Sequence, residues 1–122
     1  MAGAIKKSFD AADETRKPDK TEVNVVDLGG GLKAARVQMQ PGWKWSECIK
    51  PIVGTDSCQV HHEGTLVQGR MHVRHDDGTE IEIGPGDAYV ISPGHDAWVL
   101  GDEAVIGFEF DSKAAETFAQ TT

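Results

Sequence analysis

Residues 56–69, DSCQVHHEGTLVQG, contain the densest group of potential metal ligands in the sequence. Cys58 and the adjacent His61 and His62 stand within five positions of one another, and Asp56 precedes them. Histidine is the commonest metal-binding side chain, and a thiolate adds affinity for zinc, iron and copper. On an extended strand, Cys58 shares one face with His62 and Asp56, whereas His61 points the opposite way. The spacing therefore predicts Cys58 and His62 as an inward-facing pair.

Of the remaining histidines, His95 is the best placed to join this pair. It follows the Pro93-Gly94 turn, from which a side chain can reach back toward a neighbouring strand. Asp96 next to it is placed to orient the ring through its second nitrogen, as acidic residues often do for metal-bound imidazoles. His72 and His75 lie in an alternating segment and are expected on a solvent-facing side.

Short runs with period-two alternation predict the elements that must position these residues. Glycine and proline separate the runs where turns are needed, and Asp77-Gly78 predicts a tight hairpin between two of them. Eight or nine short strands with almost no helix favour an all-β sandwich or closed barrel, whose open end can hold one ligand. The expected strands are residues 22–28, 32–39, 43–50, part of 56–69, 70–75, 79–83, 87–92, 97–100 and 104–110.

The length of 122 residues fits a single domain. Residues 1–20, polar and with a proline at position 18, are expected to form a flexible N-terminal arm with at most a turn or two of helix. Residues 21–111 would form the barrel. Residues 112–122 would form a short C-terminal helix, with Ser112 as a possible N-cap.

The net charge of −8 opposes binding to phosphate backbones and anionic membrane surfaces, so neither nucleic acid nor membrane is an expected partner. No stretch reaches the roughly 20 apolar residues of a membrane span, and the first twenty residues lack the apolar core of a signal peptide. We therefore expect a cytoplasmic protein. There, Cys48 and Cys58 would be free thiols or ligands; the alternative is a secreted domain with a disulfide between them.

The stretch PGDAYVISPGHDAW adds a second pattern of glycine, acid, apolar strand, proline-glycine turn and histidine. With residues 56–69 it resembles the two motifs of the cupin family, over roughly residues 33–110. The resemblance implies a double-stranded β-helix, or jelly-roll barrel, in which three histidines and a glutamate usually hold one divalent metal. Gly69, Gly86 and the 92–94 turn match the family, but every ligand slot is altered: the glutamate slot falls on His62.

Two interpretations of this departure remain open. Either the barrel has lost its metal and serves as a non-catalytic ligand-binding or dimerising module, or the ligand set has been rebuilt from His62, His95 and Cys58. We favour the rebuilt set, because ligand types reappear one position from where they were lost. His61, Asp56, Cys48 and Asp96 are the candidates for a further ligand or a supporting role.

A set of two histidines and one cysteine suits one divalent transition metal, zinc or iron better than magnesium; nickel, manganese and copper stay open. The expected function is metal-dependent chemistry of dioxygenase, isomerase or lyase type on a small-molecule substrate, as the cupin resemblance implies. Trp98, Trp45 and Lys50 are the expected pocket residues. The resemblance also implies a homodimer.

Overall fold

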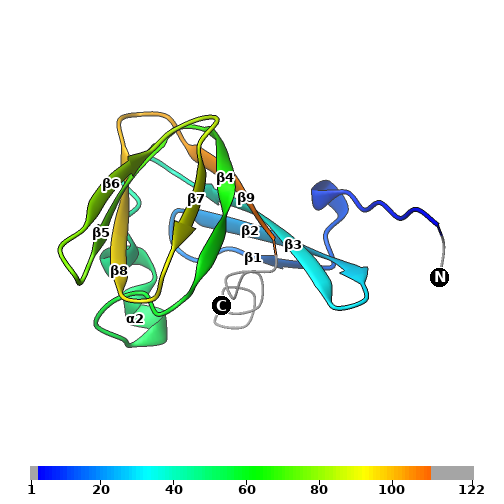
Figure 1. Ribbon diagram of the computed structural model, residues 1–122, viewed down its shortest axis with the longest axis horizontal. Coiled ribbons are helices and arrows are strands. Elements are labelled where there is room, and N and C mark those ends of the chain that lie inside the picture. The colour runs from blue at the N-terminus through cyan, green and yellow to red at the C-terminus, as the bar shows by residue number, and fades with distance from the viewer. Residues whose placement is uncertain (1–2, 111–122) are drawn as a thin grey trace.

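The protein folds into two antiparallel β-sheets that face each other, as a computed structural model of residues 3–110 describes it (Figure 1). The larger sheet has the strand order β1-β2-β3-β9-β4-β7, and the smaller has the order β6-β5-β8. This architecture confirms the all-β prediction. The strands are β1 (Glu14–Arg16), β2 (Thr21–Gly29), β3 (Leu32–Met39), β4 (His62–Gln68), β5 (Arg70–His75), β6 (Glu80–Ile83), β7 (Ala88–Ile91), β8 (His95–Leu100) and β9 (Val105–Phe110).

Alternating burial along the strands places one side of each sheet in the space between the sheets. On β9, for example, the side chains of Val105 and Glu109 are buried, whereas Phe110 is exposed. The inward positions on the other strands carry mostly Val, Leu, Ile and Met, and their removal from water stabilises the two-layer arrangement. Any polar side chain at an inward position of these strands therefore points into the barrel interior.

The Asp77-Gly78 hairpin is present as predicted. Strands β5 and β6 pair antiparallel, with Arg74 opposite Glu80, and Gly78 adopts a φ of 95° that favours glycine. The backbone N–H of Gly78 donates to the carbonyl oxygen of His75 at 3.0 Å, which closes the turn. This hairpin fixes the outer edge of the smaller sheet.

The strand expected at residues 43–50 is wrong, because this segment contains two short helices, α1 (Trp45–Cys48) and α2 (Lys50–Val53). Trp45, Cys48 and Ile49 are all buried, and their i, i+3, i+4 spacing is that of a helix face. Gly54, with a φ of 78°, ends α2 and donates its N–H to the Lys50 carbonyl at 2.8 Å. The apolar residues here follow a helical period rather than period two.

Residues 3–20 differ from the flexible arm that we expected for residues 1–20. They contain a single turn of 3₁₀-helix, η1 (Phe9–Ala11), and the strand β1, which pairs with β2. The Asp13 carboxylate accepts hydrogen bonds from the Asp27 N–H at 2.7 Å and from Lys7 Nζ at 2.9 Å, which ties the segment to the sheet. The backbone hydrogen bond to Asp27, with help from Lys7, lowers the pKa of Asp13. The helix expected at 112–122 lies outside the described residues.

Within residues 3–110, no helix is long and apolar enough to cross a membrane. The two cysteines, Cys48 and Cys58, are both buried free thiols. The alternative of a disulfide between them is therefore wrong.

Candidate metal centre

Cys58, His62 and His95 come together inside the barrel, where all three side chains are buried. Each offers one ligand atom, and these three atoms lie within 4.8 Å of one another. His62 begins β4 and His95 begins β8, while Cys58 lies just ahead of β4. Cys58 pairs with His95 through backbone hydrogen bonds, including Cys58 N–H to the His95 carbonyl at 2.7 Å. This backbone pairing between Cys58 and the start of β8 holds the thiol beside both imidazole rings.

The distance between the Cys58 and His62 donor atoms fits a tetrahedral metal ion. With metal–sulfur and metal–nitrogen bonds of about 2.3 and about 2.0 Å at a tetrahedral angle, the sulfur and nitrogen ligands lie about 3.5 Å apart. Cys58 Sγ and His62 Nε2 are separated by 3.7 Å, and the His62 and His95 rings have centroids 5.1 Å apart at a steep angle of 68°. Three protein ligands would leave one tetrahedral position open, as in catalytic rather than structural zinc sites.

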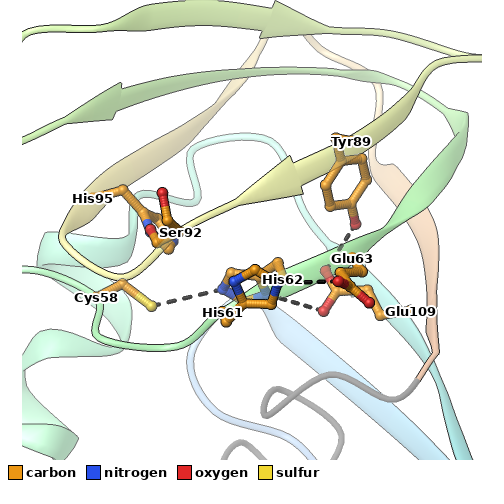
Figure 2. A network of polar contacts seen from close by, with 8 residues as sticks. All are labelled: Cys58, His61, His62, Glu63, Tyr89, Ser92, His95 and Glu109. Carbon is orange, nitrogen blue, oxygen red and sulfur yellow. Dashed lines mark hydrogen bonds and ion pairs between the residues drawn. The ribbon is translucent and has the colours of Figure 1, made fainter.

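A buried carboxylate orients the ring of His62. His62 Nδ1 lies 2.9 Å from Oε1 of Glu109, and the Tyr89 hydroxyl donates to Oε2 of the same carboxylate at 2.7 Å (Figure 2). In the neutral tautomer that donates its Nδ1 proton to Glu109, Nε2 carries the lone pair and lies toward Cys58. A carboxylate on the far nitrogen of a metal-binding histidine is the common supporting arrangement, and it raises the ligand's basicity.

A backbone carbonyl plays the same part for His95. His95 Nδ1 lies 2.9 Å from the carbonyl oxygen of Ser92, which leaves Nε2 free to face the other two ligands. The expectation that Asp96 orients this ring is wrong. Its carboxylate instead accepts hydrogen bonds from the backbone N–H groups of Ser46 at 3.2 Å and Ala97 at 2.9 Å, because Asp96 alternates to the opposite side of β8. It fastens α1 to the smaller sheet.

The electrostatics of the centre favour a charged cysteine. Burial by itself raises the pKa of the Cys58 thiol, but hydrogen bonds and attraction from His62 and His95 outweigh it and lower that pKa to about 6. For His62, burial lowers the pKa, while the negative charge of Glu109 and the contact with Cys58 raise it more, so that the imidazolium is favoured. The metal-free site thus holds a thiolate next to a protonated imidazole, and a metal ion must displace that proton.

The donors open onto a small cavity between the two sheets. Its free volume is about 30 Å³, which is room for about two water molecules. Gly64 and Gly107 make space for the Glu109 and Tyr89 side chains at one wall of the cavity. A Cβ on Gly64 would overlap the Phe108 backbone oxygen and crowd Glu109. Most of the remaining lining is apolar, with Val37, Met39, Leu66, Met71, Ile91 and Ala97 as its aliphatic and thioether side chains.

Of the other expected metal-site residues, none in the described structure reaches the three ligands. Asp56 is exposed, and His61 Nε2 faces away to Oε1 of Glu63 at 3.1 Å. Cys48 is buried in α1 but does not line the cavity, and burial raises the pKa of its thiol. Among residues 3–110, the candidate ligands that lie together are therefore Cys58, His62 and His95.

Of the expected pocket residues, only Trp45 lines the cavity; Lys50, at the start of α2, does not. The placement of Trp98 in the pocket is wrong. Its ring stacks on His72 at 4.7 Å, and the cations of Lys44 and Arg74 lie 5.2 and 5.5 Å from its centroid. His95, Ala97 and Val99 take the buried positions of β8, so the alternation turns Trp98 outward.

Sequence reasoning missed Glu109 and Tyr89, although a signal exists. Glu109 is an acidic residue at an inward position of β9, in step with Val105 and Gly107. A charged side chain in that register must find a partner or a ligand, because an unpaired buried charge is costly. Tyr89 is likewise in step with Ile91 on β7.

No family model matches the sequence, and no curated protein sequence matches it. Solved structures do match. An RmlC-like cupin from Shewanella frigidimarina superposes with a TM-score of 0.61 at 17% identity, covering 92% of this chain and 93% of that one. The chain has the cupin fold. Ectoine synthase from P. lautus (TM-score 0.64, 12% identity, 88% and 77% covered) and KdgF from Halomonas sp. (0.58, 22%, 89% and 93%) are similar to this chain over most of their length.

The arrangement of buried side chains in this cavity permits two kinds of chemistry. Cys58, His62 and Glu109 stand in the order nucleophile, base and orienting acid that covalent catalysis uses. A thiol nucleophile needs access to an acyl group, however, and Cys58 is only 2% exposed beside space for about two water molecules. His95 also has no part in such a triad, whereas a metal site uses all three donors.

Proposed function

We propose that this cupin binds one divalent transition metal through Cys58 Sγ, His62 Nε2 and His95 Nε2, and acts on a small oxygen-containing molecule at that ion. The carrying observation is the convergence of three buried donors within 4.8 Å, two of them with their far nitrogens already hydrogen-bonded. Zinc and iron(II) are the favoured ions, since thiolate and imidazole suit them better than magnesium or calcium.

The protein's own residues would prepare the site for catalysis. A divalent ion in this position supplies Lewis-acid polarisation of a bound carbonyl, carboxylate or dioxygen. Glu109 holds the proton on His62 Nδ1 and keeps Nε2 directed inward, while the Ser92 carbonyl does the same for His95. The apolar walls exclude bulk water, which strengthens electrostatic interactions inside the cavity.

The size of the cavity supports a small substrate. Free space for about two water molecules beside the ligands accommodates a molecule of a few non-hydrogen atoms, or the reactive end of a longer one. The fold is compatible with catalysis, because ectoine synthase shares it and its name denotes an enzyme. Fold similarity does not select a reaction among dioxygenase, isomerase and lyase chemistry.

Metal analysis of the purified protein tests the proposal. Protein prepared without added metal should carry about one equivalent of zinc or iron, or take up one equivalent of Co²⁺ with a thiolate-to-cobalt charge-transfer band. Cys58→Ser should abolish that band, and His95→Ala should abolish stoichiometric binding. His72→Ala is the matched control, because His72 lies on the outer face against Trp98. A folded protein that binds none of these ions would overturn the proposal.

A non-catalytic cupin that binds a small ligand is the second candidate, and the enclosed apolar cavity is the observation that favours it. This candidate predicts ligand binding that survives metal removal by a chelator. The metal-dependent function predicts that binding is lost with the metal and returns when the metal is restored. Isothermal titration of metal-free and metal-loaded protein with the same ligand separates the two.

A further inference from the structure

Trp43 lines the same cavity, and its polar atom lacks a partner. The indole Nε1 is buried, and it is the one buried side-chain nitrogen or oxygen within residues 3–110 that has no hydrogen bond. Indole N–H is a donor only, and buried donors in native proteins nearly always have an acceptor. Because Trp43 lines the cavity, a group bound there is the candidate acceptor for this N–H.

The fold holds this indole in place. Trp43 is only 4% exposed, and its backbone carbonyl accepts a hydrogen bond from the Val99 N–H at 3.0 Å, which fastens it to β8. The turn at Gly42, with a φ of 89°, directs the chain inward just before it. Because Trp43 belongs to the core cluster, its ring would have to disrupt packing to move its N–H into solvent.

The surroundings specify the chemistry of the missing acceptor. The cavity combines a place for a cation, one uncharged donor and walls that are mostly aliphatic. A cation and an N–H both favour a ligand oxygen that carries negative charge. The aliphatic walls favour an apolar group in the rest of that ligand. The free volume of about 30 Å³ limits that remainder to a few atoms.

We infer that the Nε1–H of Trp43 donates a hydrogen bond to an oxygen of a small carboxylate bound at the Cys58/His62/His95 centre. This inference rests on the proposed metal function and adds a substrate class to it. Trp43 is then a specificity residue: one carboxylate oxygen would meet the ion, and the indole would select the orientation of the second. Formate and acetate are the smallest probes of this class, and benzoate exceeds the space available.

Indole NMR reads the contact directly. In zinc-loaded protein with ¹⁵N-labelled tryptophan, addition of acetate should shift the Trp43 indole ¹H–¹⁵N resonance downfield, while that of the outward-facing Trp98 stays in place. Peaks are assigned from Trp43→Phe and Trp98→Phe. Benzoate should leave both resonances unchanged.

Affinity measurements provide the second readout. Trp43→Phe keeps an aromatic ring but removes the donor, so acetate should bind about tenfold or more weakly, as expected for loss of a hydrogen bond to a charged group. Trp98→Phe should bind acetate like the unaltered protein. Cobalt-loaded protein, whose visible spectrum responds to its fourth ligand, gives both affinities.

The outcomes separate this inference from the proposed function. If the protein binds no metal, the proposed function fails first. If it binds metal stoichiometrically but acetate leaves the Trp43 resonance unmoved, and Trp43→Phe binds acetate as well as the unaltered protein, the inference is wrong while the metal site stands. A shift of the indole resonance together with weaker binding by Trp43→Phe supports it.

Discussion

Replacing Glu109 with glutamine should weaken metal binding although Glu109 lies outside the ligand set. The glutamine has nearly the same shape, so its carbonyl oxygen can still accept from His62 Nδ1 while its amide donates to the Tyr89 hydroxyl. What disappears is the negative charge. Loss of a partner of this kind costs about 10–100-fold in metal affinity, or about 1.4–2.7 kcal/mol.

The size of the loss should depend on pH in a definite direction. In the metal-free protein Glu109 also favours the proton on His62, and that proton competes with the metal. The carboxylate interacts with one positive charge in that state and with two when a divalent ion is bound, so removal of its charge harms the metal more. Glu109→Gln relieves some proton competition near neutrality, and the deficit should grow as pH rises and that competition fades.

Competition with a chromophoric chelator, repeated from neutral to mildly alkaline pH, measures this deficit. Glu63→Gln is the control, because Glu63 pairs with His61 outside the cavity and its loss should leave the affinity unchanged. Circular dichroism and the thermal midpoint establish that Glu109→Gln is folded. Equal affinity for Glu109→Gln and the unaltered protein at every pH would refute the assigned role of the carboxylate.

Three further results are expected. In metal-free protein carrying Cys48→Ala, the thiolate absorbance of Cys58 should titrate near pH 6 rather than near its ordinary value of 9.0; a midpoint near 9 would contradict the contacts described. The lowered pKa of Cys58 makes a stabilising contribution that grows from about pH 6 to 9.0, whereas the raised pKa of His62 makes one that is lost from about pH 6.5 to 10. Because these two contributions oppose each other, the pair should leave the thermal midpoint of the metal-free protein nearly unchanged between about pH 6.5 and 9. Gly64→Ala should lower the unfolding free energy by about 3 kcal/mol or more in urea titrations, since its Cβ would overlap the Phe108 backbone oxygen. Gly84→Ala, whose Cβ would have no neighbour closer than 3.8 Å, should cost much less.

Local patterns predicted the strands well because burial on one face of a sheet leaves a period-two record in the sequence. The same rule placed Cys58 and His62 on one side of the chain, and the turn at Pro93-Gly94 brought His95 into consideration. The structure brings these three side chains together. Their role as metal ligands stays a prediction.

The supporting residues could not be found in the same way, because their partners are fixed by strand pairing. Glu109 stands 47 positions from His62, and it reaches the ring only because β9 pairs with β4 so that Gly64 lies opposite it. No local pattern specifies that register. Trp98 is close to His95 in sequence, but the alternation along β8 turns its side chain outward, so nearness in sequence does not predict a shared cavity.

The charges of the buried centre argue for a divalent ion in particular. Without metal, the Cys58 thiolate and the Glu109 carboxylate face one imidazolium, which leaves the interior with an excess negative charge. An ion that displaces the His62 proton must replace the positive charge of the imidazolium. To make the interior neutral, it must also offset the one excess negative charge. A divalent cation does both, because two positive charges balance the thiolate and the carboxylate, whereas a monovalent ion only replaces the proton. Since unbalanced charge in a low-dielectric interior is costly, Glu109 would contribute to the choice of a bound ion as well as to the orientation of the ring.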